Sequence, residues 1–194
     1  VGKEAGLVRV DGQYYYADKN GKLATGRIWV GTYPSHGLLP AGYREFGADG
    51  KILNGVVAKE DGTYYYETGR PVDTGWLKVG DDYYVFTNGG KALTGKNWVG
   101  SYLTQTSRDP YKAGRFFFDE DGKLTSGIAQ TEDGYFYMEN GKPKMAGLVC
   151  IDGEYYLAEA DGKLATGRVW VGSYIMSKSK NPLAVGYYEF DANG

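Results

Sequence analysis

The 194-residue chain has a net charge of −2 and contains 31 glycines, 19 tyrosines and 6 prolines. Its aromatic content exceeds that of a disordered linker, and its glycines do not recur at every third position as they do in collagen. The scattered lysines and arginines exclude the basic patch of a nucleic-acid-binding protein, and the absence of any run of 18 apolar residues argues against insertion in a membrane.

The chain opens with a predicted β-hairpin. Residues 7–10 are β-prone, Asp11-Gly12 has the sequence of a two-residue turn with two positive φ angles, and residues 13–16 give an aromatic return strand. Asn20-Gly21 then predicts a second turn. Related turn sequences precede aromatic residues at Asp61-Gly62, Asp133-Gly134 and Asp152-Gly153. No stretch of 11 or more residues has helical periodicity.

The hairpin pattern repeats along the whole chain. Residues 21–31 recur as residues 162–172 with ten of eleven identities. Because a lone hairpin is marginally stable in water, such units must stack on one another. We therefore predict a single repeat module over residues 1–194, interrupted at Gly194 as a fragment of a larger protein would be. Eight units of about twenty residues, of which the second, the fifth and already the eighth are longer, open near Gly6, Gly26, Gly55, Gly75, Gly95, Gly127, Gly147 and Gly167.

The segment Thr74-Gly-Trp-Leu-Lys-Val-Gly-Asp-Asp-Tyr-Tyr84 resembles the cell-wall-binding repeats of Gram-positive surface proteins. These include the choline-binding repeats of autolysins and the glucan-binding repeats of glucosyltransferases, and clostridial toxin receptor-binding repeats are related. The resemblance implies an all-β fold, a β-hairpin solenoid with about three hairpins per turn. It also implies a non-catalytic module without cofactors, secreted or on the cell surface, that anchors a parent protein to a cell-wall polymer or polysaccharide.

Choline-type attachment to teichoic acid is the first alternative function. In choline-binding repeats the resemblance places a Trp, directly after the opening glycine, and the first aromatic residue of the return strand around a quaternary ammonium, which cation–π attraction favours. Here only Trp76 has that position, with Tyr83 as its partner. We therefore expect weak choline binding, and we keep a structural stalk as a further alternative. The other units have Leu7, Arg27, Val56, Lys96, Ile128, Leu148 and Arg168 in place of the Trp.

Three longer units share a second motif, Gly-Arg/Lys-x-Trp-Val-Gly-Ser/Thr-Tyr, followed by an insertion. Strand alternation predicts that the cation, the Trp and the Tyr lie on one face. Aromatic faces stack on sugar rings, and the cations donate hydrogen bonds to hydroxyl groups. The same Trp residues are also consistent with packing anchors. The three candidate sets are Arg27, Trp29 and Tyr33; Lys96, Trp98 and Tyr102; and Arg168, Trp170 and Tyr174.

The opening glycines of the three longer units lie 69 and 72 residues apart, which is three units each time. With three hairpins per turn the candidate sets would align along one edge and form a multivalent surface. The insertions, residues 34–41, 103–113 and 175–185, differ in sequence and favour a function on that face.

Catalytic and metal sites are not predicted. His36, the single histidine, lies in an insertion, and no serine or cysteine has a motif with a partner base. Asp119-Glu-Asp-Gly122 lacks the ligand spacing of a calcium loop. Cys150 has no second cysteine with which to form a disulfide, so stability must come from packing.

Overall fold

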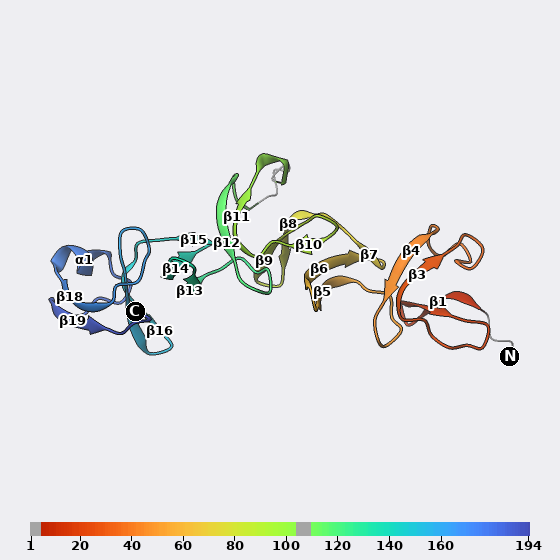
Figure 1. Ribbon diagram of the computed structural model, residues 1–194, viewed down its shortest axis with the longest axis horizontal. Coiled ribbons are helices and arrows are strands. Elements are labelled where there is room, and N and C mark those ends of the chain that lie inside the picture. The colour runs from red at the N-terminus through yellow and green to blue at the C-terminus, as the bar shows by residue number, and fades with distance from the viewer. Residues whose placement is uncertain (1–4, 104–109) are drawn as a thin grey trace. The chain divides into compact units, whose positions relative to one another are not determined.

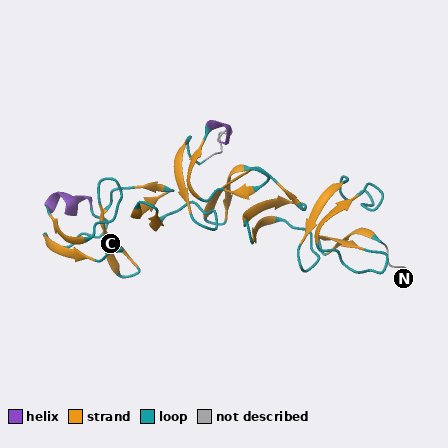
Figure 2. Cartoon of the chain, viewed as in Figure 1, coloured by secondary structure: helices purple, strands orange, loops and turns teal. Residues whose placement is uncertain are grey.

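A computed structural model describes residues 5–103 and 110–194, and it confirms the predicted all-β fold of repeated hairpins (Figure 1). Figure 2 shows helix only in two insertions, as the 3-10 helix η1 (Ser101–Leu103) and the α-helix α1 (Ser173–Lys178). Six residues are too few to show a periodic apolar pattern, so α1 was not predictable from periodicity.

The described residues form eight two-stranded hairpins, numbered here in chain order. Every predicted opening glycine is the first residue of a hairpin. The pairs are β1 (Gly6–Val10) and β2 (Gln13–Ala17); β3 (Gly26–Val30) and β4 (Gly42–Phe46); β5 (Gly55–Lys59) and β6 (Gly62–Glu67); β8 (Gly75–Val79) and β9 (Asp82–Thr87); β11 (Gly95–Val99) and β12 (Gly114–Phe118); β13 (Gly127–Thr131) and β14 (Gly134–Glu139); β16 (Gly147–Ile151) and β17 (Glu154–Ala158); and β18 (Gly167–Val171) and β19 (Gly186–Phe190). The two-residue strands β7 (Arg70–Pro71), β10 (Lys91–Ala92) and β15 (Lys142–Pro143) lie in the connections between hairpins.

The hairpin turns are of two kinds. Asp11-Gly12 and Asp152-Gly153 form two-residue turns in which both residues have positive φ, as predicted. The prediction is wrong by one residue at Asp61-Gly62, because Lys59 pairs with Gly62 and the two residues before Gly62 make the turn. Gly62, with a φ of 139°, instead opens the return strand, and Asp133-Gly134 differs from the prediction in the same way.

The chain divides into two compact units. The first comprises residues 1–79 and 85–92, and the second comprises residues 80–84 and 93–194. The largest sheet has the strand order β5-β6-β10-β9-β8, with β7 also paired to β6. The organisation of residues 1–194 as one repeat module stays a prediction.

Successive hairpins within each unit are joined by backbone hydrogen bonds. The connection that follows a hairpin pairs with the return strand of the hairpin before it. A hairpin therefore depends on its successor to satisfy its backbone groups. In the first unit Ile52 N donates to Tyr14 O at 2.8 Å, Glu45 N to Gly69 O at 2.9 Å and Tyr65 N to Gly90 O at 2.8 Å; in the second unit Leu124 N donates to Tyr83 O at 2.7 Å, Phe117 N to Gly141 O at 2.8 Å and Tyr137 N to Gly162 O at 2.8 Å.

The insertions of hairpins 2 and 8 dock on the first strand of the preceding hairpin. Leu7 N donates a hydrogen bond to Pro34 O at 2.7 Å, and Leu148 N donates to Ser179 Oγ at 2.8 Å. Both leucines are buried in clusters that include the inward valine of the long hairpin, Val30 or Val171. These two insertions thus have a structural role as well as an exposed surface.

Candidate ligand-binding platforms

The exposed Trp residues of the long hairpins follow from strand alternation. In β3, Ile28 and Val30 face the core, whereas Arg27 and Trp29 face solvent. Val30 is completely buried, and Trp29 is 57% exposed. Trp98 and Trp170 have the same strand position and are 62% and 52% exposed. Packing in the core therefore does not account for these three Trp side chains.

In hairpin 2 the solvent face carries a cluster of one cation and two aromatic rings. Tyr43 in β4 lies directly across from Trp29, and the two ring centroids are 5.1 Å apart in an edge-on arrangement. The guanidinium carbon of Arg27 lies 4.4 Å from the Tyr43 ring centroid. We call this cluster, Arg27, Trp29 and Tyr43, platform 1.

Hairpin 8 repeats the arrangement with similar distances between the rings and the cation. Tyr187 lies across from Trp170, with the ring centroids 5.0 Å apart and again edge-on. The guanidinium carbon of Arg168 is 4.6 Å from the Tyr187 ring centroid. Arg168, Trp170 and Tyr187 form platform 3.

Hairpin 5 has a different composition at the same positions. Arg115, in place of a tyrosine, lies across from Trp98. Phe117 lies across from Lys96, whose Nζ atom is 5.5 Å from the Phe117 ring centroid. Lys96, Trp98 and Arg115 form platform 2, which combines one exposed indole with two cations.

The tyrosines that the sequence placed in these sets follow the strands instead of lying within them. Tyr33 is in the turn after β3 and is 91% exposed, and Tyr174 is in α1 and is 68% exposed. The side chain of Tyr102 lies outside the described residues. Strand alternation therefore places the predicted cation and Trp together, but it does not extend to these tyrosines.

Sequence reasoning missed Tyr43 and Tyr187, the cross-strand partners of Trp29 and Trp170. A signal for them exists in the chain, because Gly-Tyr-x-Glu-Phe occurs at residues 42–46 and again at 186–190. The insertions separate each tyrosine from its Trp, so the pairing is not visible from residue spacing alone.

An open groove of about 450 Å³ lies beside Trp29 in the first unit. Its walls come from the return strand of hairpin 1, the connection after it, and β3. Besides Trp29, the lining residues include Tyr16, Lys22, Leu23 and Ile28. The platform thus adjoins a concave surface that has both apolar and charged walls, as ligand sites commonly do.

Trp76 and Tyr83, the residues of the predicted choline cage, have a different environment. Trp76 is only 7% exposed, and Leu7 and Leu148 are also buried at the same position of hairpins 1 and 7. Tyr83 is half-buried, and its ring lies edge-on to Tyr111 with the centroids 5.7 Å apart. Trp76 therefore offers little surface to a ligand in this conformation.

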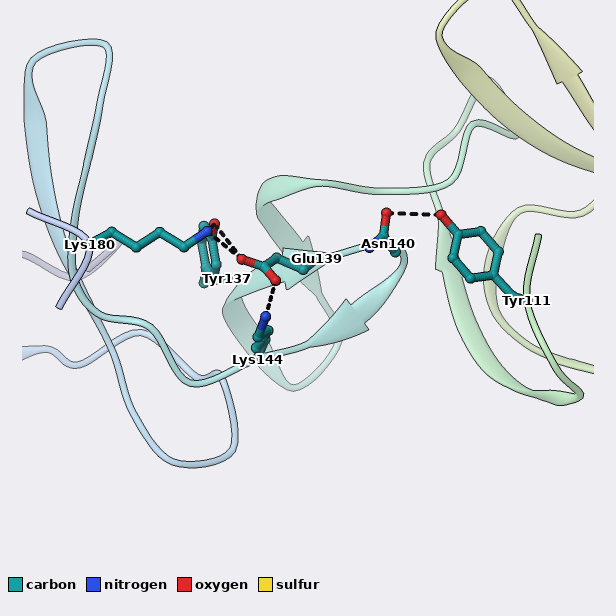
Figure 3. Close-up of polar contacts among 6 residues, drawn as sticks. All are labelled: Tyr111, Tyr137, Glu139, Asn140, Lys144 and Lys180. Atoms are coloured by element: carbon teal, nitrogen blue, oxygen red, sulfur yellow. Dashed lines mark hydrogen bonds and ion pairs between the residues drawn. The ribbon is translucent and has the colours of Figure 1, made fainter. Parts of the chain in front are cut away.

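A cluster of charged side chains surrounds Glu139 at the end of β14 (Figure 3). Lys144 and Lys180 both donate hydrogen bonds to its carboxylate, and these bonds lower the pKa of Glu139 to about 2. Lys180 Nζ also donates to Tyr137 Oη at 2.7 Å. On the other side of hairpin 6, Tyr111 Oη donates to Asn140 Oδ1 at 2.9 Å.

A metal centre and a membrane-spanning helix are both absent from the described part of the chain. Residues 5–103 and 110–194 contain no group of three His, Cys, Asp or Glu side chains that is arranged to hold a metal ion. Neither helical segment in these ranges has the length and apolar character needed to cross a bilayer. His36 Nε2 lies 3.1 Å from Ala5 O, so its ring contacts the residue directly before β1, the strand that its insertion covers.

Comparison with known proteins gives one family match and several structural matches. Residues 6–23 match the family described as a putative cell wall binding repeat, whereas no curated protein matches the chain. Choline binding protein F from Streptococcus pneumoniae, in the presence of a peptidoglycan analogue, is 23% identical over 84% of this chain and 52% of that chain, with a TM-score of 0.42. This chain thus spans about half the length of that protein.

Two other solved structures are similar over nearly the whole chain. The choline-binding domain of CbpL from Streptococcus pneumoniae is 24% identical over 98% of this chain and 95% of that chain, with a TM-score of 0.41. Alternansucrase in complex with isomaltononaose is 19% identical over 98% of this chain and 13% of that chain, with a TM-score of 0.42.

Proposed function

Because the chain carries a putative cell wall binding repeat at residues 6–23, as its resemblance to that family predicts, we propose that it is a non-catalytic carbohydrate-binding module. It would anchor a parent protein to a cell-wall polymer or polysaccharide on the surface of Gram-positive bacteria. The observation that carries the proposal is the exposure of Trp29, Trp98 and Trp170 at one strand position in three hairpins.

The exposed indoles contribute less to the stability of the fold than buried indoles would. Burying apolar surface stabilises a protein by roughly 25 cal/mol per Å², and each of the three Trp side chains leaves more than half of its surface in water. A flat aromatic surface next to donors of hydrogen bonds suits a sugar ring, which presents C–H groups on its faces and hydroxyl groups at its rim. The neighbouring Arg27, Lys96 and Arg168 supply such donors.

A repeating ligand would use several platforms at once. Each platform needs to bind one segment of the polymer only weakly, because linked sites raise the overall avidity by about 10²–10⁴ when the geometry allows simultaneous binding. The predicted alignment of the three sets along one edge of a solenoid would favour such binding. This mode differs from the choline alternative, which depends on Trp76 and Tyr83, and from a stalk, which needs no exposed Trp.

The proposal is tested with the whole chain on polysaccharide affinity gels and a glycan array. Replacing Trp29, Trp98 and Trp170 together by Ala should weaken binding about tenfold or more, since aromatic contacts are each worth roughly 1 kcal/mol. Tyr155→Ala is the matched control, because Tyr155 is an exposed aromatic residue outside the platforms. Equal binding by the triple variant and the parent would place the site elsewhere, and an absence of glycan binding by the parent would contradict the function.

The exposed tyrosines give a second, milder test. Replacing Tyr33, Tyr102 and Tyr174 together by Ala should weaken glycan binding while the melting temperature falls little, because Tyr33 and Tyr174 are largely exposed. Choline should not elute the chain from the polysaccharide gel, whereas it should elute a choline-binding module from a cationic amine resin.

A further inference from the structure

Each platform contains an arginine that no described carboxylate binds directly, although Glu45 lies across from Arg27 and Glu189 across from Arg168. Among the residues that the structure describes, the side chains of Arg27, Arg115 and Arg168 form no hydrogen bond and no ion pair. Arg27 and Arg168 contact the faces of Tyr43 and Tyr187. All three arginines are solvent-exposed.

Two other arginines, Arg44 and Arg70, are used to hold the fold, whereas the exposed Arg9 lies over the Tyr14 ring. Arg44 is buried and donates hydrogen bonds to Tyr43 O at 3.1 Å and Pro40 O at 2.8 Å. Arg70 donates to Ala41 O at 3.0 Å. The arginines beside the exposed Trp residues therefore contrast with those that support the loops around them.

The stacking of Arg27 and Arg168 leaves their donors available. A guanidinium that stacks on a ring uses its flat face, and the N–H groups at its edge remain free to donate two parallel bonds to a phosphate or a carboxylate. The ring also restricts the motion of the arginine, so less side-chain entropy is lost on binding. In platforms 1 and 3 an indole contacts the same tyrosine ring on which the arginine stacks.

We propose that the ligand is an anionic polysaccharide, in which a sugar ring stacks on the Trp and an attached phosphate or carboxylate group binds the neighbouring cation. This inference rests on the proposed function and narrows its substrate class. The net charge of −2 gives the chain no general attraction for polyanions, so anion recognition would have to arise locally at the platforms.

The three platforms differ in their nearby acidic groups, which predicts a ranking. Platform 2 has two cations, and the neutral Phe117 lies across from Lys96, but Lys96 also lines a groove that contains Asp119 and Glu120. In platform 1, Glu45 lies across from Arg27. Burial opposes ionisation of Glu45, but hydrogen bonds from Lys59 and Tyr66 outweigh it and keep the pKa of Glu45 below its ordinary value.

The carboxylate of Glu45 already forms an ion pair with the ammonium of Lys59, so its charge is partly neutralised. In platform 3, Glu189 lies across from Arg168 and is exposed, with no ion pair among the described residues. We therefore expect anion binding to be stronger at platform 1 than at platform 3.

The test compares three forms of one polymer, namely neutral dextran, phosphorylated dextran and carboxymethyl dextran of equal length, each bound by the whole chain. We expect tighter binding to one or both charged forms than to the neutral form, with the difference reduced at high salt because salt screens exposed charges. A preference between the two charged forms would identify phosphate or carboxylate as the recognised group.

A charge-matched pair of variants makes the test specific. R27Q/K96Q/R115Q/R168Q should lose the preference for the charged polymers, with the ratio of charged to neutral affinity falling about tenfold, as expected for four exposed ionic contacts. R9Q/K19Q/K51Q/K163Q changes the net charge equally and should keep the preference. Equal binding of the parent to all three dextrans, or an equal loss in both variants, would overturn the inference; exposed-Trp-dependent binding to the neutral form would still support the proposed function.

Discussion

Lys180, in the insertion of hairpin 8, pairs with Glu139, which lies 41 residues earlier at the end of hairpin 6. The same carboxylate accepts a hydrogen bond from Lys144, so two ammonium groups share one acidic group (Figure 3). Tyr137 completes the cluster by accepting a hydrogen bond from Lys180. The insertion thus contacts hairpin 6 as well as β16 of hairpin 7, and it ties three consecutive hairpins together.

Removal of this acidic group should destabilise the second unit. We expect Glu139→Gln to lower the free energy of unfolding by about 1 kcal/mol, since the carboxylate is partly shielded from solvent and binds two cations. Urea denaturation monitored by tyrosine fluorescence measures the change. Asp49→Asn is the control, because the Lys51–Asp49 pair is about half exposed on both sides and should contribute little. Equal effects of the two substitutions would contradict a special role for Glu139.

The same cluster predicts a dependence of stability on acid pH. Hydrogen bonds from Lys144 and Lys180 lower the pKa of Glu139 from 4.5 to about 2 in the folded chain. The unfolded chain therefore takes up this proton more readily, so the stabilisation is present above pH 4.5 and is lost as the pH falls toward 2. Unfolding measured across this range should show a weaker pH dependence for Glu139→Gln than for the parent. Identical slopes would mean that the carboxylate is not held in this way.

Trp29 and Trp76 offer a direct comparison of an exposed and a buried Trp. Trp76→Ala should cost about 3–5 kcal/mol of stability, as is usual when a large buried side chain is truncated. Trp29→Ala should cost well under half as much, because more than half of its side chain already lies in water. Chemical denaturation of the two variants measures the difference. A cost for Trp29 as large as that for Trp76 would support the packing interpretation of the exposed indoles.

Choline affinity should be marginal. Calorimetry is expected to show binding no tighter than the millimolar range, worth about 4 kcal/mol. The reason is that Trp76 is the one Trp at the position after an opening glycine, and that it is buried. Tight binding at several sites would show that tyrosine and aliphatic side chains of this chain can form a cage without an exposed Trp.

Sequence and structure agree best where a local rule decides the geometry. The opening glycines and the Asp11-Gly12 turn were predictable because turn chemistry is local, and the placing of Arg27 and Trp29 on one face followed from the period of two in a strand. The shift of the turn next to Gly62 was not predictable from the Asp-Gly pair, because the pairing register decides which residue takes the positive φ.

Two kinds of contact were not predicted from the sequence. One kind depends on how two strands pair after an insertion, and the other depends on docking between hairpins. Tyr43 reaches Trp29 only because β4 pairs with β3 in one register after an insertion of variable length. The contact between Lys180 and Glu139 requires the insertion of one hairpin to reach another two hairpins away. Neither relationship leaves a fixed spacing in the chain.

The backbone pairing between consecutive hairpins gives each unit a direction. The return strand of one hairpin is covered by the connection that follows the next hairpin, as Tyr14 O is covered by Ile52 N and Tyr137 N by Gly162 O. Unravelling a unit from its C-terminal side would therefore uncover strand edges one at a time, each with unpaired amide and carbonyl groups. Such edges pair readily with strands of other molecules. The order of the hairpins consequently determines which end of a partly unfolded chain becomes prone to aggregation.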